Sequence, residues 1–391
     1  MMRRLIVLFV CAALLAGCGT RVGKWFGSSS KDNVDAPAEL TDFAPSVGVD
    51  KLWSLRLGKG ERRLWIRQAP AVVEGRVYAA TLQGRVVALD LESGRELWRS
   101  ETGMRLSGGP GAAGGFVVVG SLDGDVLALD ADSGAERWRT RVSSEVISRP
   151  LLAHGMAVVR SNDGRVFGLD LGEGARRWVF DRGIPALTVR GNASPVLGQG
   201  LVYLGYDDGT VVALRVQDGL RVWEQVVAEP DGRSELERMA DVDGDLQVGL
   251  SEVFAISFKG QMLAMDAANG RPLWTRDTGS YAGLALLGDR LVVADKAGSV
   301  WAIDRNSSSA LWRQEALAHR WLTTPAVQGD YAVVGDLQGY LHWLRLGNGE
   351  LAARVRLGKE PIRATPQVSP EGILVAIDTY GELAAYRLGG P

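Results

Sequence analysis

One pattern recurs along most of the chain: an X-Gly pair, a short apolar run that ends in Asp, a second Gly and then a Trp. It is plainest from Gln83 to Trp98, and it returns in strict register from Asp123 to Trp138 and from Asp163 to Trp178. Eight X-Gly pairs occur in all, at Gly84, Gly124, Gly164, Gly209, Gly260, Gly298, Gly339 and Gly381. A repeat of about forty residues is typical of chains that assemble similar supersecondary units side by side.

Each repeat has the signature of four short strands. A half-buried strand such as 117–120 precedes the X-Gly turn, an alternating strand such as 126–129 follows it, and a Trp-bearing strand comes after the second Gly. A further strand fits segments such as 149–152 and 194–197. Four strands per repeat are the composition of a propeller blade. The sequence therefore predicts an all-β, eight-bladed β-propeller over residues 46–391.

The two ends of the repeat region are incomplete in complementary ways. The last repeat runs from Gly381 to Arg387 and stops before a Trp strand, whereas the strand-like segment 52–57, which contains Trp53, has no repeat before it. We expect this N-terminal strand to complete the last blade, because closure of the ring leaves no terminal sheet edge unpaired.

The recurring Trp and Asp residues are interpreted as structural. Large aromatic side chains at a fixed blade position fill the seams between adjacent sheets. The Asp series is expected to accept hydrogen bonds from turn amides, and its members are Asp90, Asp130, Asp170, Asp266 and Asp304. The seventh repeat departs from the pattern, since Ala353 stands where Trp is expected.

The N-terminus has the pattern of a lipoprotein signal peptide. Two arginines precede the apolar run 5–16, which ends in Leu-Ala-Gly and then Cys18. We predict removal of residues 1–17, lipid attachment to Cys18 and a flexible tether over 18–45. The apolar run is too short to span a bilayer as a permanent helix, and Gly19 favours the periplasmic face of the outer membrane. The alternative is an ordinary signal peptide in which Cys18 is incidental.

Two strings indicate a family. The run Ala-Leu-Asp-x-x-x-Gly-x-x-x-Trp, seen at 88–98 and 128–138, resembles the repeat of pyrroloquinoline-quinone dehydrogenases, which are eight-bladed enzymes. Taken with the lipoprotein signal and the segments 319–325, 334–341 and 237–243, nearly the whole chain resembles the BamB family, the lipoprotein subunits of the outer-membrane β-barrel assembly machine. That resemblance implies a periplasmic scaffold that binds the POTRA domains of BamA and helps outer-membrane proteins fold.

The resemblance also implies partner-binding residues. The docking surface of the family includes a Leu-x-(apolar)-Arg-Gly segment, which matches Leu187, Val189 and Arg190 here, and an Asp-Val-Asp segment, which matches Asp241 and Asp243. After Asp243 the sequence departs from the family pattern, so the shape of the following loop is left open.

Repeat length points to the same region without the resemblance. The third and fourth repeats are longer than the first two, and the extra residues fall in the connections 180–193 and 225–243. Both join a Trp strand to the next blade, so they should lie side by side on one face, where long loops on a rigid ring often carry function. The alternative is that they are tolerated insertions, since loop closure costs little.

Motifs for other functions are missing. No catalytic residue, cofactor clamp or metal-ligand cluster is identifiable, and the three histidines are too scattered for a zinc site. A net charge of −2 does not favour nucleic-acid binding. We therefore predict a non-enzymatic protein without cofactors that acts as a monomer within a hetero-complex. The alternatives are a periplasmic quinoprotein-like dehydrogenase or other ligand-binding propeller, and a lipoprotein with a different envelope partner. A secondary hypothesis within the scaffold role is that exposed outer blade edges pair transiently with unfolded barrel strands.

Overall fold

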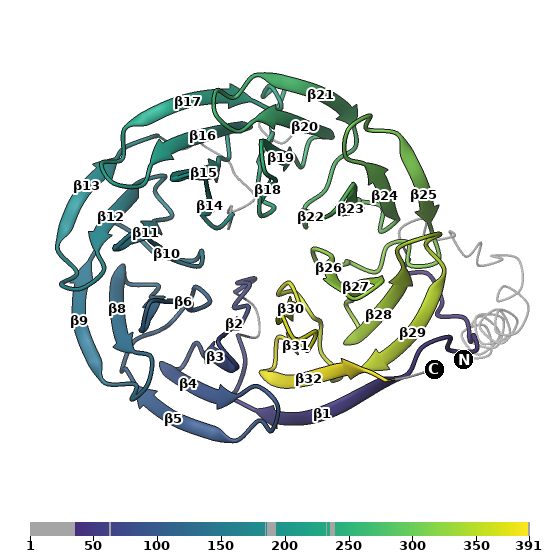
Figure 1. The fold of residues 1–391 in the computed structure, drawn as a ribbon, viewed down its shortest axis with the longest axis horizontal. Helices are drawn as coiled ribbons and strands as arrows, with labels where there is room; N and C mark the ends of the chain where they lie inside the picture. The colour runs from purple at the N-terminus through teal and green to yellow at the C-terminus, as the bar shows by residue number, and fades with distance from the viewer. Residues whose placement is uncertain are drawn as a thin grey trace, which may run out of the picture. The chain divides into compact units, whose positions relative to one another are not determined.

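The computed structural model describes residues 36–61, 64–183, 185, 193–231, 233–234 and 239–389. The strands within these residues form eight antiparallel four-stranded sheets, which are arranged as blades in a ring (Figure 1). The predicted eight-bladed β-propeller is thus confirmed. The described part of the chain contains no helix that is long and apolar enough to cross a membrane.

The first four blades take their strands in chain order, from the centre of the ring outward. Blade 1 is β2 (Ala71–Val73), β3 (Arg76–Ala80), β4 (Arg85–Asp90) and β5 (Glu96–Glu101); blade 2 is β6 (Gly111–Ala113), β7 (Phe116–Gly120), β8 (Asp125–Asp130) and β9 (Glu136–Arg141). Blade 3 is β10 (Leu151–Ala153), β11 (Met156–Arg160), β12 (Val166–Asp170) and β13 (Arg176–Phe180); blade 4 is β14 (Val196–Gly198), β15 (Leu201–Gly205), β16 (Thr210–Arg215) and β17 (Arg221–Val226).

The next three blades repeat this order, and the eighth differs only in its outermost strand. Blade 5 is β18 (Gln247–Val248), β19 (Glu252–Ile256), β20 (Gln261–Asp266) and β21 (Pro272–Asp277); blade 6 is β22 (Leu284–Leu287), β23 (Arg290–Ala294), β24 (Val300–Asp304) and β25 (Ala310–Gln314). Blade 7 is β26 (Ala326–Gln328), β27 (Tyr331–Gly335), β28 (Tyr340–Arg345) and β29 (Leu351–Arg356); blade 8 is β30 (Gln367–Val368), β31 (Leu374–Ile377), β32 (Glu382–Leu388) and β1 (Val49–Arg56).

The ring closes as the sequence predicts. Strand β1 pairs antiparallel with β32, so that Trp53 lies opposite Ala385 and Val49 lies opposite Leu388. The first and last strands of the propeller are therefore neighbours in one sheet, and no blade is left with an incomplete set of strands.

The middle strands are more deeply buried than the sequence pattern suggests. In β4 the four residues from Val86 to Leu89 are all buried, and β8 shows the same pattern from Val126 to Leu129. Each sheet packs against a neighbouring blade on both of its faces, so the strand needs apolar side chains at every position and not at alternate ones. The predictions of a half-buried strand at 117–120 and an alternating strand at 126–129 are therefore wrong, since all four residues of each are buried.

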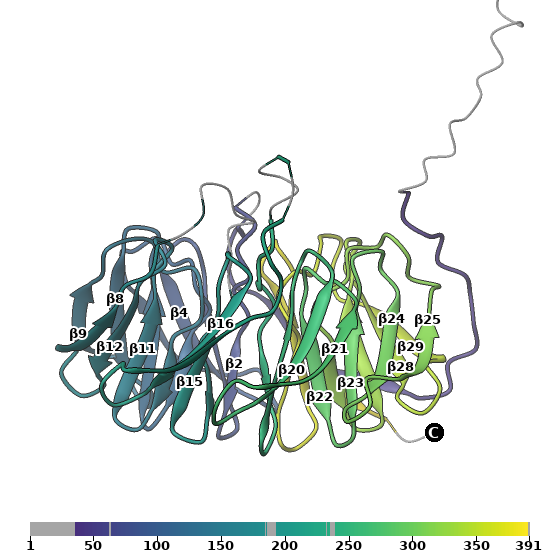
Figure 2. The ribbon, with the colours of Figure 1, turned by 90° about the horizontal axis from the view of Figure 1, so that it is seen from above.

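Strand direction alternates within each blade, which places two sets of loops on the same face of the ring (Figure 2). We call this the connection face. It carries the X-Gly turns and the links from one blade to the next, which are residues 57–70, 102–110, 142–150, 181–195, 227–246, 278–283, 315–325 and 357–366. The turns that contain the Asp series and the second Gly lie on the opposite face.

The Trp series holds adjacent blades together. Trp98 in β5 donates its indole N–H to the carbonyl of Ala131 in blade 2 at 2.8 Å, and its ring lies on Gly134 of the same turn. A Cβ atom at Gly134 would lie 2.4 Å from the ring. The same bond to the next blade recurs for Trp53, Trp138, Trp178, Trp223, Trp274 and Trp312. The interpretation of these residues as seam residues is confirmed.

The absence of Trp at Ala353 has a topological cause. Each seam Trp donates its indole N–H to the turn between the third and fourth strands of the next blade. In blade 8 these strands are β32 and β1, which come from opposite ends of the chain, so a Trp in β29 would find no such turn. The seam uses Trp343 instead, whose indole N–H donates to Gln328 Oε1 at 2.8 Å. The amide of Gln328 donates to the carbonyls of Gly372 and Tyr386 in blade 8.

The Asp series also behaves as expected. Asp90 Oδ1 accepts the amide of Ser93 at 2.9 Å, and Asp130 Oδ1 accepts that of Ser133 at the same distance. Asp170, Asp266 and Asp304 bind turn amides in the same way. These carboxylates are thus used to hold the turns of their own blades.

The compact unit begins at Pro37, earlier than the predicted boundary at residue 46. Ala38 donates its amide to the carbonyl of Ala318 at 2.9 Å, and Arg354 Nη1 donates to the carbonyl of Thr41 at 3.0 Å. Residues 37–45, which we assigned to the tether, therefore lie along blades 6 and 7. The predicted signal peptide and Cys18 fall outside the described residues.

Candidate docking face

The predicted docking residues belong to the two longest links of the connection face, 181–195 and 227–246. Leu187, Val189 and Arg190 lie outside the described residues. Asp241 and Asp243 are described. The two links touch, because the amide of Ser194 in the first donates to Asp245 Oδ1 in the second at 2.9 Å. The expectation that they lie side by side is confirmed for this part.

The Asp-Val-Asp segment is buried between blades 4 and 5. Val242 packs in the apolar seam, and its amide donates to the carbonyl of Tyr206 in blade 4 at 3.1 Å. The carbonyl of Asp241 accepts the amide of Phe258 in blade 5 at 2.8 Å. Val242 is 0% exposed, and the acidic residues on each side of it are buried too: Asp241 is 0% exposed and Asp243 is 5% exposed.

Three buried carboxylates meet at this place. Asp207, Asp241 and Asp243 each contribute an oxygen, and these oxygens lie within 4.8 Å of one another. Oxygen ligands of this kind suit a hard divalent cation, but the cluster already has a cationic neighbour. Arg160 contacts Asp207 Oδ1 at 3.3 Å and donates to the carbonyl of Gly205 at 2.7 Å.

The Asp243 carboxyl is the member of this cluster whose pKa is strongly raised. Burial, followed by the nearby carboxylates of Asp241 and Asp207, raises the pKa of Asp243 from 3.8 to about 8, although Arg67 and Arg160 partly oppose the shift. Its Oδ1 atom has no hydrogen-bond partner within the described part of the chain. At neutral pH Asp243 is therefore mostly protonated, which lowers the negative charge held inside the face.

We predict that Asp243→Asn stabilises the folded protein at alkaline pH. Between pH 3.8 and about 8, Asp243 is protonated in the folded protein and ionised in the unfolded chain. The free energy of unfolding therefore falls as pH rises through this range. Asparagine does not ionise, so the free energy of unfolding of the variant does not fall in this range, and at pH 8 it should exceed that of the wild-type protein by on the order of a few kcal/mol. Urea unfolding at pH 5 and pH 8 measures it.

The exposed substitution Asp330→Asn is the matched control, and its effect should not change between the two pH values. Equal effects of pH on the wild-type protein and on Asp243→Asn would contradict the assignment of the raised pKa to this carboxyl.

Sequence reasoning missed Arg160 and Asp207. The signal that was available is a break in the repeat register. Arg160 ends the second strand of blade 3, where the first two blades have Ala80 and Gly120, and Asp207 stands at the position of Leu82 and Leu122. Charged residues at positions that are small or apolar in neighbouring repeats indicate a local change of role.

A second buried network joins two of the strings that carried the family resemblance. Arg320 is 2% exposed, and its Nε and Nη2 atoms lie 2.8 and 2.7 Å from Asp336 Oδ2. His342 Nδ1 accepts a hydrogen bond from Arg354 Nε at 3.3 Å, so Nε2 carries the proton and donates to Asp336 Oδ2 at 3.0 Å. The segments 319–325 and 334–341 thus meet through one carboxylate.

The ionised form of Asp336 is favoured despite its burial. Burial opposes ionisation, but the hydrogen bond from His342, the amide of Tyr340 and the charge of Arg320 outweigh it and hold the pKa of Asp336 below its ordinary value. Asp336 Oδ1 also accepts the amides of Gln338 and Tyr340 at 2.8 and 3.0 Å.

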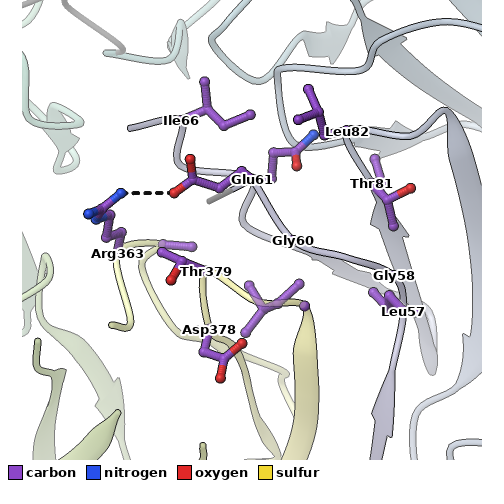
Figure 3. A pocket seen from close by; sticks show the side chains of 15 residues that line it. Leu57, Gly58, Gly60, Glu61, Ile66, Thr81, Leu82, Arg363, Asp378 and Thr379 are labelled. Carbon is purple, nitrogen blue, oxygen red and sulfur yellow. Dashed lines mark hydrogen bonds and ion pairs between the residues drawn. The ribbon is translucent and has the colours of Figure 1, made fainter. Parts of the chain in front are cut away.

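A pocket lies at the seam between blades 8 and 1 on the connection face (Figure 3). Glu61 and Arg363 form an ion pair at 2.9 Å beside it, and Leu57, Ile66 and Asp378 contribute to its wall. Burial raises the pKa of Glu61, an effect that the charge of Arg363 reduces.

Comparisons with known proteins identify the family. A sequence profile described as outer membrane protein assembly factor BamB matches residues 82–314. The chain is 48% identical to the outer membrane protein assembly factor BamB of Xanthomonas campestris pv. campestris, over 99% of this chain and 98% of that protein. It belongs to the BamB family.

Solved structures agree with this assignment. The crystal structure of BamB from Moraxella catarrhalis superposes with a TM-score of 0.79 at 28% identity, and the match covers 87% of this chain and all of that one. A europium-containing methanol dehydrogenase has the same fold, with a TM-score of 0.71 over 87% of this chain and 93% of that chain. At 14% identity the dehydrogenase shows the fold alone.

Proposed function

We propose that this member of the BamB family is a non-catalytic scaffold of the outer-membrane protein assembly machinery. It docks to the POTRA domains of BamA through the links 181–195 and 227–246, and a lipid on Cys18 holds it at the periplasmic face of the outer membrane. The observation that carries the proposal is the family assignment together with the contact between these two links at Ser194 and Asp245.

The two groups of docking residues have different roles in this proposal. Leu187, Val189 and Arg190 provide apolar contacts and a cation that pairs with a partner carboxylate, which are features of interface hot spots. Asp241 and Asp243 are buried, so we assign them to holding the second link in place beneath that contact.

The non-catalytic part of the proposal is supported by how the acidic residues are used. The Asp series binds turn amides, and Asp336 is saturated by Arg320, His342 and two amides. The resemblance to a dehydrogenase is confined to the propeller fold.

Recovery of BamA from detergent-solubilised membranes tests the docking proposal. We expect Arg190→Ala to lower the recovery of BamA about tenfold or more, because an interface arginine that pairs with a carboxylate is a common hot spot. Arg215→Ala is the matched control, since Arg215 ends β16 near the opposite face and its ion pair with Asp218 is exposed.

Wild-type recovery of BamA with Arg190→Ala would overturn the assignment of Arg190. A tagged Cys18→Ser variant, exported behind a signal peptide that is cleaved without lipid attachment, tests the anchor separately, and its release into the soluble periplasmic fraction is the expected result. Retention of that variant in the outer membrane without BamA would contradict anchoring by lipid.

A further inference from the structure

Three aromatic side chains gather on the connection face outside the links 181–195 and 227–246. Trp65 and Trp321 have ring centroids 5.8 Å apart, and Tyr281 lies 6.1 Å from Trp321. Trp65 is 55% exposed and Trp321 is 56% exposed. Neither belongs to the Trp series of the seams, whose members are mostly buried, so the packing of the blades does not account for them.

The cluster lies over the centre of the ring. Its residues come from the links into blades 1, 6 and 7, and Arg67, two residues after Trp65, donates to the carbonyl of Tyr281 at 2.8 Å. Blades 1 and 6 are separated by blades 7 and 8, so this bond joins links that are not neighbours around the ring (Figure 1). Arg149, in the link into blade 3, makes similar bonds to Gln367 and to the carbonyl of Pro70.

The backbone holds both Trp residues in an unfavourable conformation. Trp65 has φ 57°, Trp321 has φ 53°, and His319 in the same link has φ 57°. Bulky residues rarely adopt left-handed φ values, and such positions persist where the surrounding structure enforces them, often at functional sites. Here the enforcing contacts are the Arg320–Asp336 pair behind Trp321 and the Arg363 guanidinium, which lies 3.7 Å from the centre of the Trp65 ring.

Arg67 is the cation beside the cluster, and at Tyr281 its positive charge acts more strongly than the negative charge of Asp295. Arg67 and Arg149 donate to carbonyl and amide oxygens, and neither has a carboxylate within ion-pair distance among the residues that the structure describes. These bonds fix the guanidinium groups without neutralising them. Preorganised Trp, Tyr and Arg side chains are the residue types that dominate protein–protein interfaces.

We propose that Trp65, Tyr281, Trp321 and Arg67 form a docking site for an acidic polypeptide segment of a partner protein. An apolar side chain of that segment lies on the two indole rings, and a carboxylate beside it pairs with Arg67. The site uses none of the residues assigned to BamA docking, so either proposal stands if the other fails.

A labelled peptide tests the site on the full mature protein. The probe is fluorescein-labelled Asp-Glu-Leu-Phe-Glu-Asp, measured by fluorescence anisotropy, and its charge-reversed counterpart is Lys-Lys-Leu-Phe-Lys-Lys. We expect the acidic peptide to bind and the basic one not to bind. Trp65→Ala with Trp321→Ala should weaken binding about tenfold or more, and Arg67→Gln should weaken both the binding and its dependence on salt.

The matched control is Leu250→Ala, because Leu250 is 88% exposed but lies outside the cluster. It should bind the acidic peptide as the wild-type protein does. Unchanged thermal unfolding of each variant shows that lost binding is not lost folding. The proposal is overturned by no binding of the acidic peptide, by equal binding of both peptides, or by unaltered affinity in the double Trp variant.

The wild-type protein and the double Trp variant also distinguish two other occupants of the cluster. Vesicles of anionic phospholipid that shift the Trp emission of the wild-type protein but not of the double Trp variant, without peptide binding, would assign the cluster to a membrane surface. Concentration-dependent self-association that is lost in the double Trp variant would assign it to a second copy of the chain. Either result would overturn the acidic-segment proposal.

Discussion

Trp98→Ala is expected to lower the free energy of unfolding by about 3–5 kcal/mol. The ring of Trp98 fills the seam between blades 1 and 2, and its indole N–H binds the Ala131 carbonyl in blade 2. The substitution removes both contacts and leaves a cavity at a place where two rigid sheets cannot close together. Equilibrium unfolding in urea measures the loss, and Leu97→Ala, one residue away and exposed, is the control.

A double-mutant cycle with Gly134 isolates the contact itself. Gly134→Ala places a Cβ atom 2.4 Å from the Trp98 ring and also has an unfavourable φ of 71°. In the Trp98→Ala background the collision disappears and only the backbone strain remains, so Gly134→Ala should cost less there than in the wild-type protein. Additive costs would show that the indole ring and the glycine turn do not act as a pair.

The second large effect is expected at Asp336. Asp336→Asn should lower the free energy of unfolding by about 3–5 kcal/mol, because it leaves the buried Arg320 guanidinium without its counter-charge. The asparagine keeps an oxygen for the turn amides of Gln338 and Tyr340, so the loss reports the contacts of Oδ2 with Arg320 and His342 and not the turn. Urea unfolding at pH 7 provides the measurement.

Asp295→Asn is the matched control for this substitution. Asp295 Oδ1 accepts the amides of Ala297 and Ser299 in the corresponding turn of blade 6, and its Oδ2 accepts the indole N–H of Trp301. Within the described part of the chain, no arginine forms an ion pair with Asp295. We expect it to cost much less. Similar losses at Asp295 and Asp336 would mean that the turn, and not Arg320, accounts for the effect.

Much of the fold could be predicted from the sequence because its causes are local. A glycine that must adopt positive φ and a Trp that follows it at fixed spacing recur in the first six repeats, and they fix both the blade and its seam. The N-terminal segment 52–57 was identified as the missing strand because it contains Trp53 without the rest of a repeat. The reason for Ala353 in place of Trp was not predicted, since it lies in the missing turn between β32 and β1 of blade 8.

The site was harder to predict because its contacts link distant parts of the chain. Residues 37–45 have a composition suited to a tether, yet they bind Ala318 and Arg354, nearly three hundred residues later. The Asp-Val-Asp segment has the polarity of a surface loop, but its backbone bonds to Tyr206 and Phe258 place all three residues between blades 4 and 5, where they are buried. Trp65 and Trp321 follow no repeat position, so no pattern in the sequence brings them together.

The pairing of β1 with β32 has a consequence for how the chain reaches its final state. Strand β1 is made first but pairs only with β32, which is made last, and until they pair β1 and the edge of β32 are both open to other chains. Contacts of such large sequence separation form slowly. The ring is therefore most exposed to aggregation just before it closes, when seven blades are present and the eighth still lacks its outermost strand.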